Sequence, residues 1–250
     1  MKIRIKETLI GMVVIILAHG LPAASQVTGA YEGDAAVSGV TVSGRAIFSG
    51  SMPKPERLPV HRDSVVCGMT MPNEALLVDR ASHGVAAVVI SLEGVTKGKP
   101  LSKELNMVLE NRACRFVSRV SATTVGSTLE IRNTDSILHN THVRRENKLG
   151  PTVINVAQPV GTSAILKPLH VVGFMDVRCD AHTFMRAAIH VFEHPYFAVT
   201  DQAGRYELPQ VPPGSYRLRM WHEAVGVRTK NITVPATGSL TVDLELNPEE

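Results

Sequence analysis

The residues best suited to chemistry are Cys179, His182 and Met185, with two residues between each successive pair. A thiolate and a thioether suit Cu(I), and an imidazole suits both oxidation states of copper. A second imidazole is available from His139, forty residues before Cys179. Two His and one Cys in a plane, with a weak axial Met, are the ligands of a type 1 copper electron-transfer site. We therefore expect these four side chains to bind one copper ion.

The remaining histidines could in principle also bind copper. His142 lies three residues after His139, so in a strand the two side chains would point to opposite faces and only one could serve. A second, catalytic copper site built from other histidines has no supporting spacing, so surface or hydrogen-bonded core positions are favoured for them. These histidines are His170, His190, His194 and His222.

The elements that must position the ligands are predicted to be β-strands. Residues 126–133 alternate, with Leu129 and Ile131 on one face, and lead to the His139 loop. Residues 171–177 have strand character and run into Cys179, and alternation resumes after Met185. The Cys-His-Met loop is thus expected to join two strands, which would fix ligand geometry before metal arrives. Residues 148–162 contain two prolines and no clear period, and they predict an irregular connection.

The N-terminal 25 residues predict export. A basic start is followed by a short apolar run and then by small residues, as in a secretory signal peptide; an uncleaved anchor is the alternative. Removal of residues 1–25 would change the formal net charge from +3 to +1. That charge gives no reason to expect nucleic acid or an anionic membrane as partner. We expect a periplasmic or secreted protein without stable membrane insertion.

Three cysteines follow this segment, and an odd number needs explanation in an oxidising compartment. Our interpretation is a Cys67–Cys114 disulfide, with Cys179 kept as a metal ligand. The alternative is that Cys67 and Cys114 are buried free thiols. A disulfide from Cys179 to either of them would exclude the copper site.

The chain after Tyr196 predicts a small separate module. Short strand patterns alternate with turns such as 201–204 and 211–214, which is typical of a β-sandwich. We expect residues 37–193 to form a first domain with an N-terminal insertion, and residues 194–247 the second. A module that small has little core of its own, so it is expected to pack on the first.

The ligand spacing, with Phe184 before the Met and an Asn140 directly after the first His, resembles the amicyanin-type cupredoxins. The resemblance implies that His139, Cys179, His182 and Met185 bind copper and that Asn140 ties the two ligand loops together. The wider pattern resembles exported "methylamine utilisation" proteins, in which a carboxypeptidase-regulatory-like (transthyretin-like) module follows the cupredoxin. The fold class expected is therefore all-β: a cupredoxin Greek-key sandwich followed by a small regulatory-like sandwich.

In cupredoxins the edge of the downstream His commonly emerges through an apolar patch, which Ala181 and Phe184 would form here. Partner docking is expected at that patch, with a c-type cytochrome or periplasmic dehydrogenase as redox partner. Two departures from the family are Thr183, where Pro is frequent, and the long segment 50–83.

We therefore predict a single-electron carrier rather than an enzyme. The chain has no phosphate-binding Gly loop, nucleophile elbow or helical zinc-protease motif. Two other functions stay open: copper binding or delivery without electron transfer, and a structural or carbohydrate-binding role.

Overall fold

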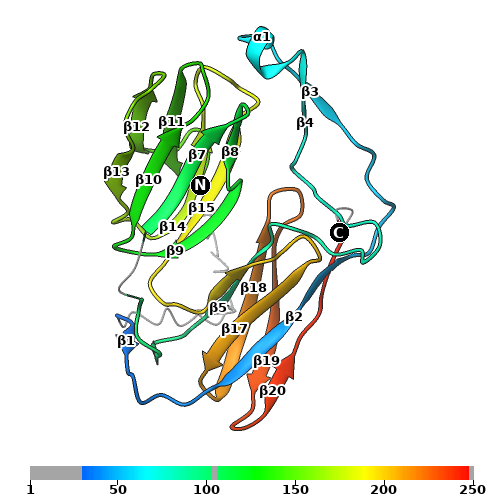
Figure 1. Cartoon of the computed structure of the whole chain (residues 1–250). Coiled ribbons are helices and arrows are strands. Elements are labelled where there is room, and N and C mark those ends of the chain that lie inside the picture. Colours follow the sequence, from blue (N-terminus) through cyan, green and yellow to red (C-terminus); the bar gives the residue numbers. More distant parts are fainter. Residues whose placement is uncertain (1–29, 103–105, 248–250) are drawn as a thin grey trace, which may run out of the picture.

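The computed structural model describes residues 30–102 and 106–247, which form two β-sandwiches with one short helix (Figure 1). The all-β prediction is confirmed. The expected signal peptide lies outside the described residues. Among the described residues, no helix is long and apolar enough to cross a membrane.

The site sandwich comprises residues 106–192 and has two sheets. One sheet has the order β13 (Ile165–Pro168), β10 (Thr128–Asn133), β7 (Asn106–Arg112) and β8 (Arg115–Val117). The other has the order β12 (Thr152–Gln158), β11 (His139–Arg145), β14 (Gly173–Arg178), β15 (Arg186–Phe192) and β9 (Val120–Thr124). Their inner faces enclose a single apolar core.

Alternation places the expected side chains in this core. Leu129 and Ile131 of β10 are fully buried while Arg132 is exposed, as the period of two predicts. The expectation of an irregular connection over 148–162 is wrong, because β12 occupies Thr152–Gln158. β12 is an edge strand with only two buried residues, so its pattern is weak, and its prolines stand just outside its ends.

The second sandwich is built from both ends of the described chain. Its sheets have the orders β16 (Phe197–Val199), β5 (Val89–Glu93), β18 (Gly214–His222), β19 (Gly226–Val234), and β17 (Arg205–Val211), β2 (Val40–Phe48), β20 (Ser239–Thr241), with β21 (Leu244–Leu246) also on β2. β2 and β5 were expected in the first domain, and the strand pairing corrects this. The site sandwich is therefore inserted between strands of the second, rather than preceding it.

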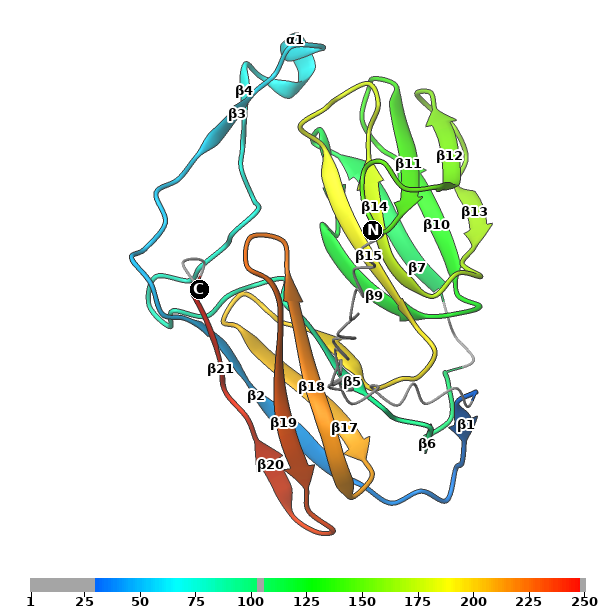
Figure 2. The ribbon, with the colours of Figure 1, turned by 180° about the vertical axis from the view of Figure 1, so that it is seen from behind.

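A long excursion leaves the second sandwich between β2 and β5. We call residues 49–75 the strap: it contains the hairpin of β3 (Arg57–Pro59) and β4 (Thr70–Pro72), with α1 (Ser64–Cys67) at its tip. Both ribbon views show it running past the site sandwich and ending at that sandwich's far end (Figures 1 and 2). A further small parallel pair joins β1 (Glu32–Gly33) to β6 (Lys97–Gly98).

The two sandwiches share an apolar interface. β15 is buried on both faces: Ala187, Ile189 and Val191 belong to the site-sandwich core. Ala188, between them, packs with Val89 of β5 in a separate cluster. The other apolar side chains on this cluster come from both sandwiches: Ala87, Val120, Ala122, Phe174, Phe192, Val199 and Trp221. The site sandwich is thus held by more than its two chain connections.

Candidate metal centre

The Cys-His-Met loop is a compact turn between β14 and β15. The His182 N–H donates to the Cys179 carbonyl (3.3 Å), and the Met185 N–H donates to the His182 carbonyl (2.9 Å). The Cys179 N–H closes the loop on the Met185 carbonyl at 3.4 Å. This backbone bonding fixes the Cα positions of Cys179, His182 and Met185. The side chains of all three are buried.

Strand register brings His139 to the same end of the sandwich. β11 and β14 are antiparallel with His142 opposite Arg178, so the start of β11 lies beside the residues that follow β14. The Asn140 N–H donates to the Cys179 sulfur at 3.3 Å, and Asn140 Oδ1 accepts from the Asp180 N–H at 3.0 Å. Asn140 therefore links the two loops, as the resemblance implied.

Three donor side chains meet at this point. One ring nitrogen of His139, one of His182 and the Cys179 sulfur all lie within 4.8 Å of one another. The Cys179 sulfur is 3.6 Å from His182 Nδ1, and the two imidazole centroids are 4.9 Å apart. Met185 is buried at the end of the same loop, in the same core cluster as Cys179.

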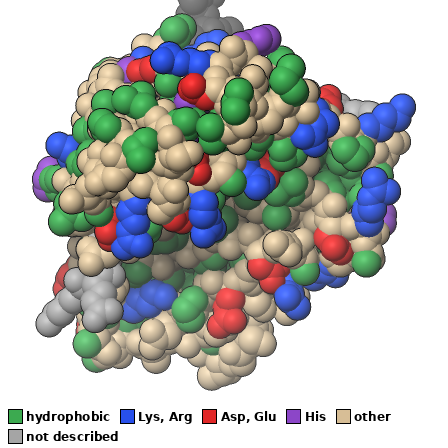
Figure 3. Space-filling model, turned by 45° about the horizontal axis from the view of Figure 1, so that its top comes forward, with side chains coloured by type: hydrophobic (Ala, Val, Ile, Leu, Met, Phe, Trp, Pro, Cys, Tyr) green, Lys and Arg blue, Asp and Glu red, His purple; other side chains and the backbone are tan. Residues whose placement is uncertain are grey.

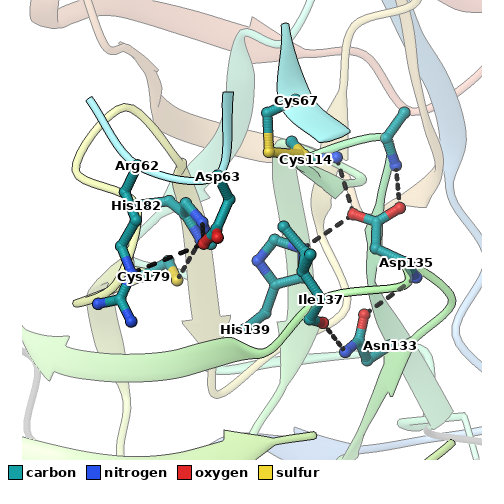
Figure 4. The surroundings of a disulfide bond; sticks show 11 residues. Arg62, Asp63, Cys67, Cys114, Asn133, Asp135, Ile137, His139, Cys179 and His182 are labelled. Atoms are coloured by element: carbon teal, nitrogen blue, oxygen red, sulfur yellow. Dashed lines mark hydrogen bonds and ion pairs between the residues drawn. A yellow bond between two sulfur atoms is a disulfide. The ribbon is translucent and has the colours of Figure 1, made fainter. Parts of the chain in front are cut away.

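Each imidazole is held from outside by a carboxylate (Figure 4). Asp135 Oδ2 lies 2.9 Å from His139 Nε2, and Asp63 Oδ2 lies 2.9 Å from His182 Nε2. An ionised carboxylate only accepts hydrogen bonds, so each Nε2 carries the proton and each Nδ1 is left with a lone pair. His139 Nδ1 is buried and has no protein partner among the described residues. This arrangement, carboxylate to imidazole with the other nitrogen free, is common around metal-ligating His.

Burial affects the protonation of these groups. It lowers the pKa of His139 below its usual value, against the opposing hydrogen bond from Asp135, so the ring is neutral at pH 7. Burial also raises the pKa of the Cys179 thiol, although the Asn140 N–H partly offsets this. A cation would supply the charge needed to hold Cys179 as a thiolate.

The site is covered, contrary to the expectation for His182. The His182 side chain is 0% exposed, because Asp63 of the strap lies over its outer edge. Phe184 packs against the apolar cluster that joins the strap to the site sandwich. The members of this cluster are Val60, Cys67, Met71 and Cys114, with Ile137 and Phe184 against them. The expectation of an exposed His182 edge in a patch of Ala181 and Phe184 is therefore wrong.

The strap also carries the disulfide. Cys67 in α1 is bonded to Cys114 in the β7–β8 turn, with a Cα–Cα distance of 5.6 Å, and Cys179 is free. This confirms the predicted pairing. The Cys114 N–H donates to Asp135 (2.8 Å), so the crosslink is one hydrogen bond from the carboxylate that holds His139.

Three other buried histidines are not part of this cluster. His142 bonds to Asp180 and Thr152 through its two ring nitrogens. His190 and His222 are buried, and the His190 ring lies 4.5 Å from that of Trp221, in the apolar interface between the sandwiches.

Sequence reasoning missed both carboxylates. Asp135 stands four residues before His139, a spacing that could have been noticed. Asp63 is 119 residues from His182, and no local pattern connects them.

Comparison with known proteins gives one family match, in the C-terminal part of the chain. Residues 183–247 match the family described as carboxypeptidase regulatory-like domain. This range contains β15 to β21, so the match includes one strand of the site sandwich. No curated protein matches the sequence.

Several solved structures are similar over part of the chain. The copper-containing nitrite reductase of Thermus scotoductus is 19% identical over 40% of this chain and 24% of its own, with a TM-score of 0.32. Amicyanin from Paracoccus versutus is 17% identical over 41% and 96%, with a TM-score of 0.30. A purple cupredoxin from Nitrosopumilus maritimus is 18% identical over 34% and 97%, with a TM-score of 0.29.

Proposed function

We propose that this protein binds one copper ion as a type 1 centre and carries single electrons. The ligands would be Cys179 Sγ, the Nδ1 atoms of His139 and His182, and the Met185 thioether. The observation that carries the proposal is the buried meeting of one thiol and two imidazoles whose Nε2 atoms are bonded to carboxylates, so that each Nδ1 keeps a lone pair. A buried polar nitrogen without a partner, such as His139 Nδ1, is costly unless something binds it.

The donor set indicates which ion. Two imidazoles and a thiolate suit zinc and copper, but a thioether favours copper. When bound, copper would accept one electron from a reduced partner and pass it to an oxidised one. The chain's own contribution is to keep the ligands fixed: both rings are held at Nε2, and the Cys179 sulfur accepts the Asn140 N–H. Fixed ligands would keep the rearrangement small when the copper ion changes its oxidation state.

A delivery protein must exchange its ligands with an acceptor, and the covered donor set is poorly suited to that. We expect the redox partner to be a c-type cytochrome or a periplasmic dehydrogenase. Apolar side chains are spread over this end of the molecule, with Lys and Arg side chains among them (Figure 3). At the tip of the strap, Val65 and Met69 are 99% and 75% exposed. A small docking surface of this kind is typical of transient electron-transfer partners.

The test is an optical and electron paramagnetic resonance titration of the purified protein with Cu(II). The wild type should show an intense thiolate-to-copper band at one equivalent, and Cys179→Ser should lose it. His142→Gln is the matched control, because His142 is a buried imidazole near the site whose ring is hydrogen-bonded to Asp180, Thr152 and Asn155; it should stay coloured. A wild type that binds copper without colour would refute electron carriage and leave copper storage or delivery. A wild type that binds no copper would favour a structural or carbohydrate-binding role.

A further inference from the structure

Asp63 reaches the metal centre from the other sandwich. The strap leaves β2 and returns to β5, both strands of the second sandwich, and its tip lies over the Cys-His-Met loop (Figures 1 and 4). The Cys67–Cys114 disulfide and the apolar cluster around it hold the tip there. One ligand of the site sandwich is therefore contacted by a carboxylate that its own fold does not supply.

The strap holds Asp63 in a conformation that local structure does not explain. Asp63 occupies the N-cap of α1, where an Asp carboxylate ordinarily accepts a backbone N–H of the helix. Here it makes no such bond, and its backbone is left-handed, with φ 56°. The carboxylate instead accepts from His182 Nε2 at 2.9 Å, with the Arg62 guanidinium 3.6 Å away. Sparsely populated backbone conformations of this kind tend to occur where a function selects them.

We infer that Asp63 is a positioning residue for His182 that lowers the reduction potential of the centre. This inference rests on the proposed copper site. The bond to Nε2 fixes the tautomer that leaves Nδ1 free, and it fixes the plane of the ring. The negative charge beside the imidazole stabilises the more highly charged Cu(II) state over Cu(I).

Asp135 acts in the same way on His139, but it has a different origin. It lies in the loop before β11 and is held by the N–H groups of Ala113 and Cys114, inside the site sandwich. Asp63 is the carboxylate that depends on the second sandwich. The second sandwich would thus take part in setting the properties of the copper centre, which gives the regulatory-like module a defined role.

The decisive variant is Asp63→Asn, because an amide oxygen can still accept from Nε2 while the charge is lost. Loss of such an outer contact typically changes metal affinity by 10-fold to 100-fold. We expect the ratio of Cu(II) to Cu(I) affinity to fall about tenfold, which corresponds to a potential about 59 mV higher for a one-electron couple. Redox titration of the blue band measures this shift.

Glu56→Gln is the matched control. Glu56 is a carboxylate on the same strap, bonded to Asn73 and not to a ligand, so this variant removes the same charge without touching His182. An unchanged potential in Asp63→Asn, or an equal shift in Glu56→Gln, would overturn the inference.

The tautomer is measured separately on the metal-free protein. Nitrogen-15 resonances of His182 should report the Nε2–H form in the wild type and in Asp63→Asn, and a mixture in Asp63→Ala. This readout does not need copper, so it separates the two proposals. A colourless wild type with a fixed Nε2–H tautomer would refute the copper function and keep the positioning role. A mixed tautomer in the wild type would refute the positioning role whatever the colour.

Discussion

The two imidazoles at the centre each have one nitrogen turned outward and one turned inward. His139 and His182 bond to carboxylates through Nε2 and keep Nδ1 for the cluster, and the Cys179 sulfur accepts the Asn140 N–H. Such pre-arranged donors lose little freedom when an ion binds, which favours tight binding. The outward contact of each imidazole therefore fixes the atom that faces the site.

Asn140 is the residue on which the link between the two ligand loops depends. In Asn140→Ala the N–H that contacts Cys179 stays, but Asp180 N–H, Asn155 and the Val156 carbonyl lose a partner. We expect the free energy of unfolding to fall by about 1–3 kcal/mol, since three hydrogen bonds are lost and each contributes up to about 1 kcal/mol net. Urea denaturation of the metal-free protein measures the loss.

Asn155→Ala is the matched control for this prediction, because it removes the side-chain partner of Asn140 on β12, with a 3.5 Å contact to His142, and leaves the bond from Asp180 to Asn140 in place. It should cost less and leave the copper band unshifted, whereas Asn140→Ala should shift the band by loosening the Cys179 loop. Equal behaviour of the two variants would show that the contact to Asp180 has no special role.

At this scale, much of the site could be predicted from sequence. Cys179, His182 and Met185 are neighbours, so their spacing carries the information, and the position of Asn140 follows from the resemblance. Asp63 could not be found, because its relation to His182 exists only after a strap from another sandwich has been placed. The covered state of His182 was unpredictable for the same reason.

At the scale of elements, the strap is tied down mainly by its crosslink. α1 has four residues and is too short to be stable alone, so Cys67 needs Cys114 and the surrounding apolar cluster to stay in place. A chain-entropy estimate for a 47-residue separation gives about 4 kcal/mol of stabilisation.

We expect Cys67→Ser/Cys114→Ser to release the strap without unfolding either sandwich. Trypsin should then cleave after Arg57 and Arg62 much faster than in the wild type, since both are exposed and docking restrains the hairpin that carries them. Mass spectrometry of timed digests measures the rates. Cleavage after Lys148, exposed in the β11–β12 turn, is the internal control and should not change. A strap that stays resistant would show that the apolar cluster alone holds it.

The positions of the strands were predicted better than the strands with which they pair. Alternation identified the strands β2, β10 and β14, because a half-buried strand shows its period in its own residues. It could not say which sheet buries the apolar face, so β2 and β5 were assigned to the wrong sandwich. β12 was missed because it is an edge strand with only two buried residues, so its sequence shows little alternation of apolar and polar residues.

At the scale of the whole molecule, two buried histidines oppose protonation: His190, at the interface between the sandwiches, and His222, at the end of β18. Burial, with a smaller effect from Arg219, lowers the pKa of His190 to about 3, and burial lowers that of His222 to about 4. His190 Nε2 also has no hydrogen-bond partner among the described residues. Both rings are therefore neutral in the folded protein at pH 5, but the same side chains in the unfolded chain have a pKa near 6.5.

The sign of the pH dependence follows from this difference. Between pH 6.5 and 4 the unfolded chain binds more protons than the folded one, so the free energy of unfolding falls as the pH falls. Each such histidine contributes a slope of up to about 1.4 kcal/mol per pH unit. The contribution is fully present above pH 6.5 and is lost progressively below it.

His190→Phe should flatten this slope by about the contribution of one histidine, because Phe keeps a ring among Phe174, Phe192 and Trp221 but cannot bind a proton. Urea unfolding at a series of pH values, followed by the fluorescence of Trp221, measures the slope. Trp221 is the one tryptophan of the sequence and lies at this interface. His170→Gln is the control: His170 is exposed, so its variant should retain the wild-type slope. An unchanged slope in His190→Phe would mean that the interface opens or takes up water before His190 is protonated. In that case the two sandwiches would separate in acid, while the Cys67–Cys114 disulfide would keep the tip of the strap on the site sandwich.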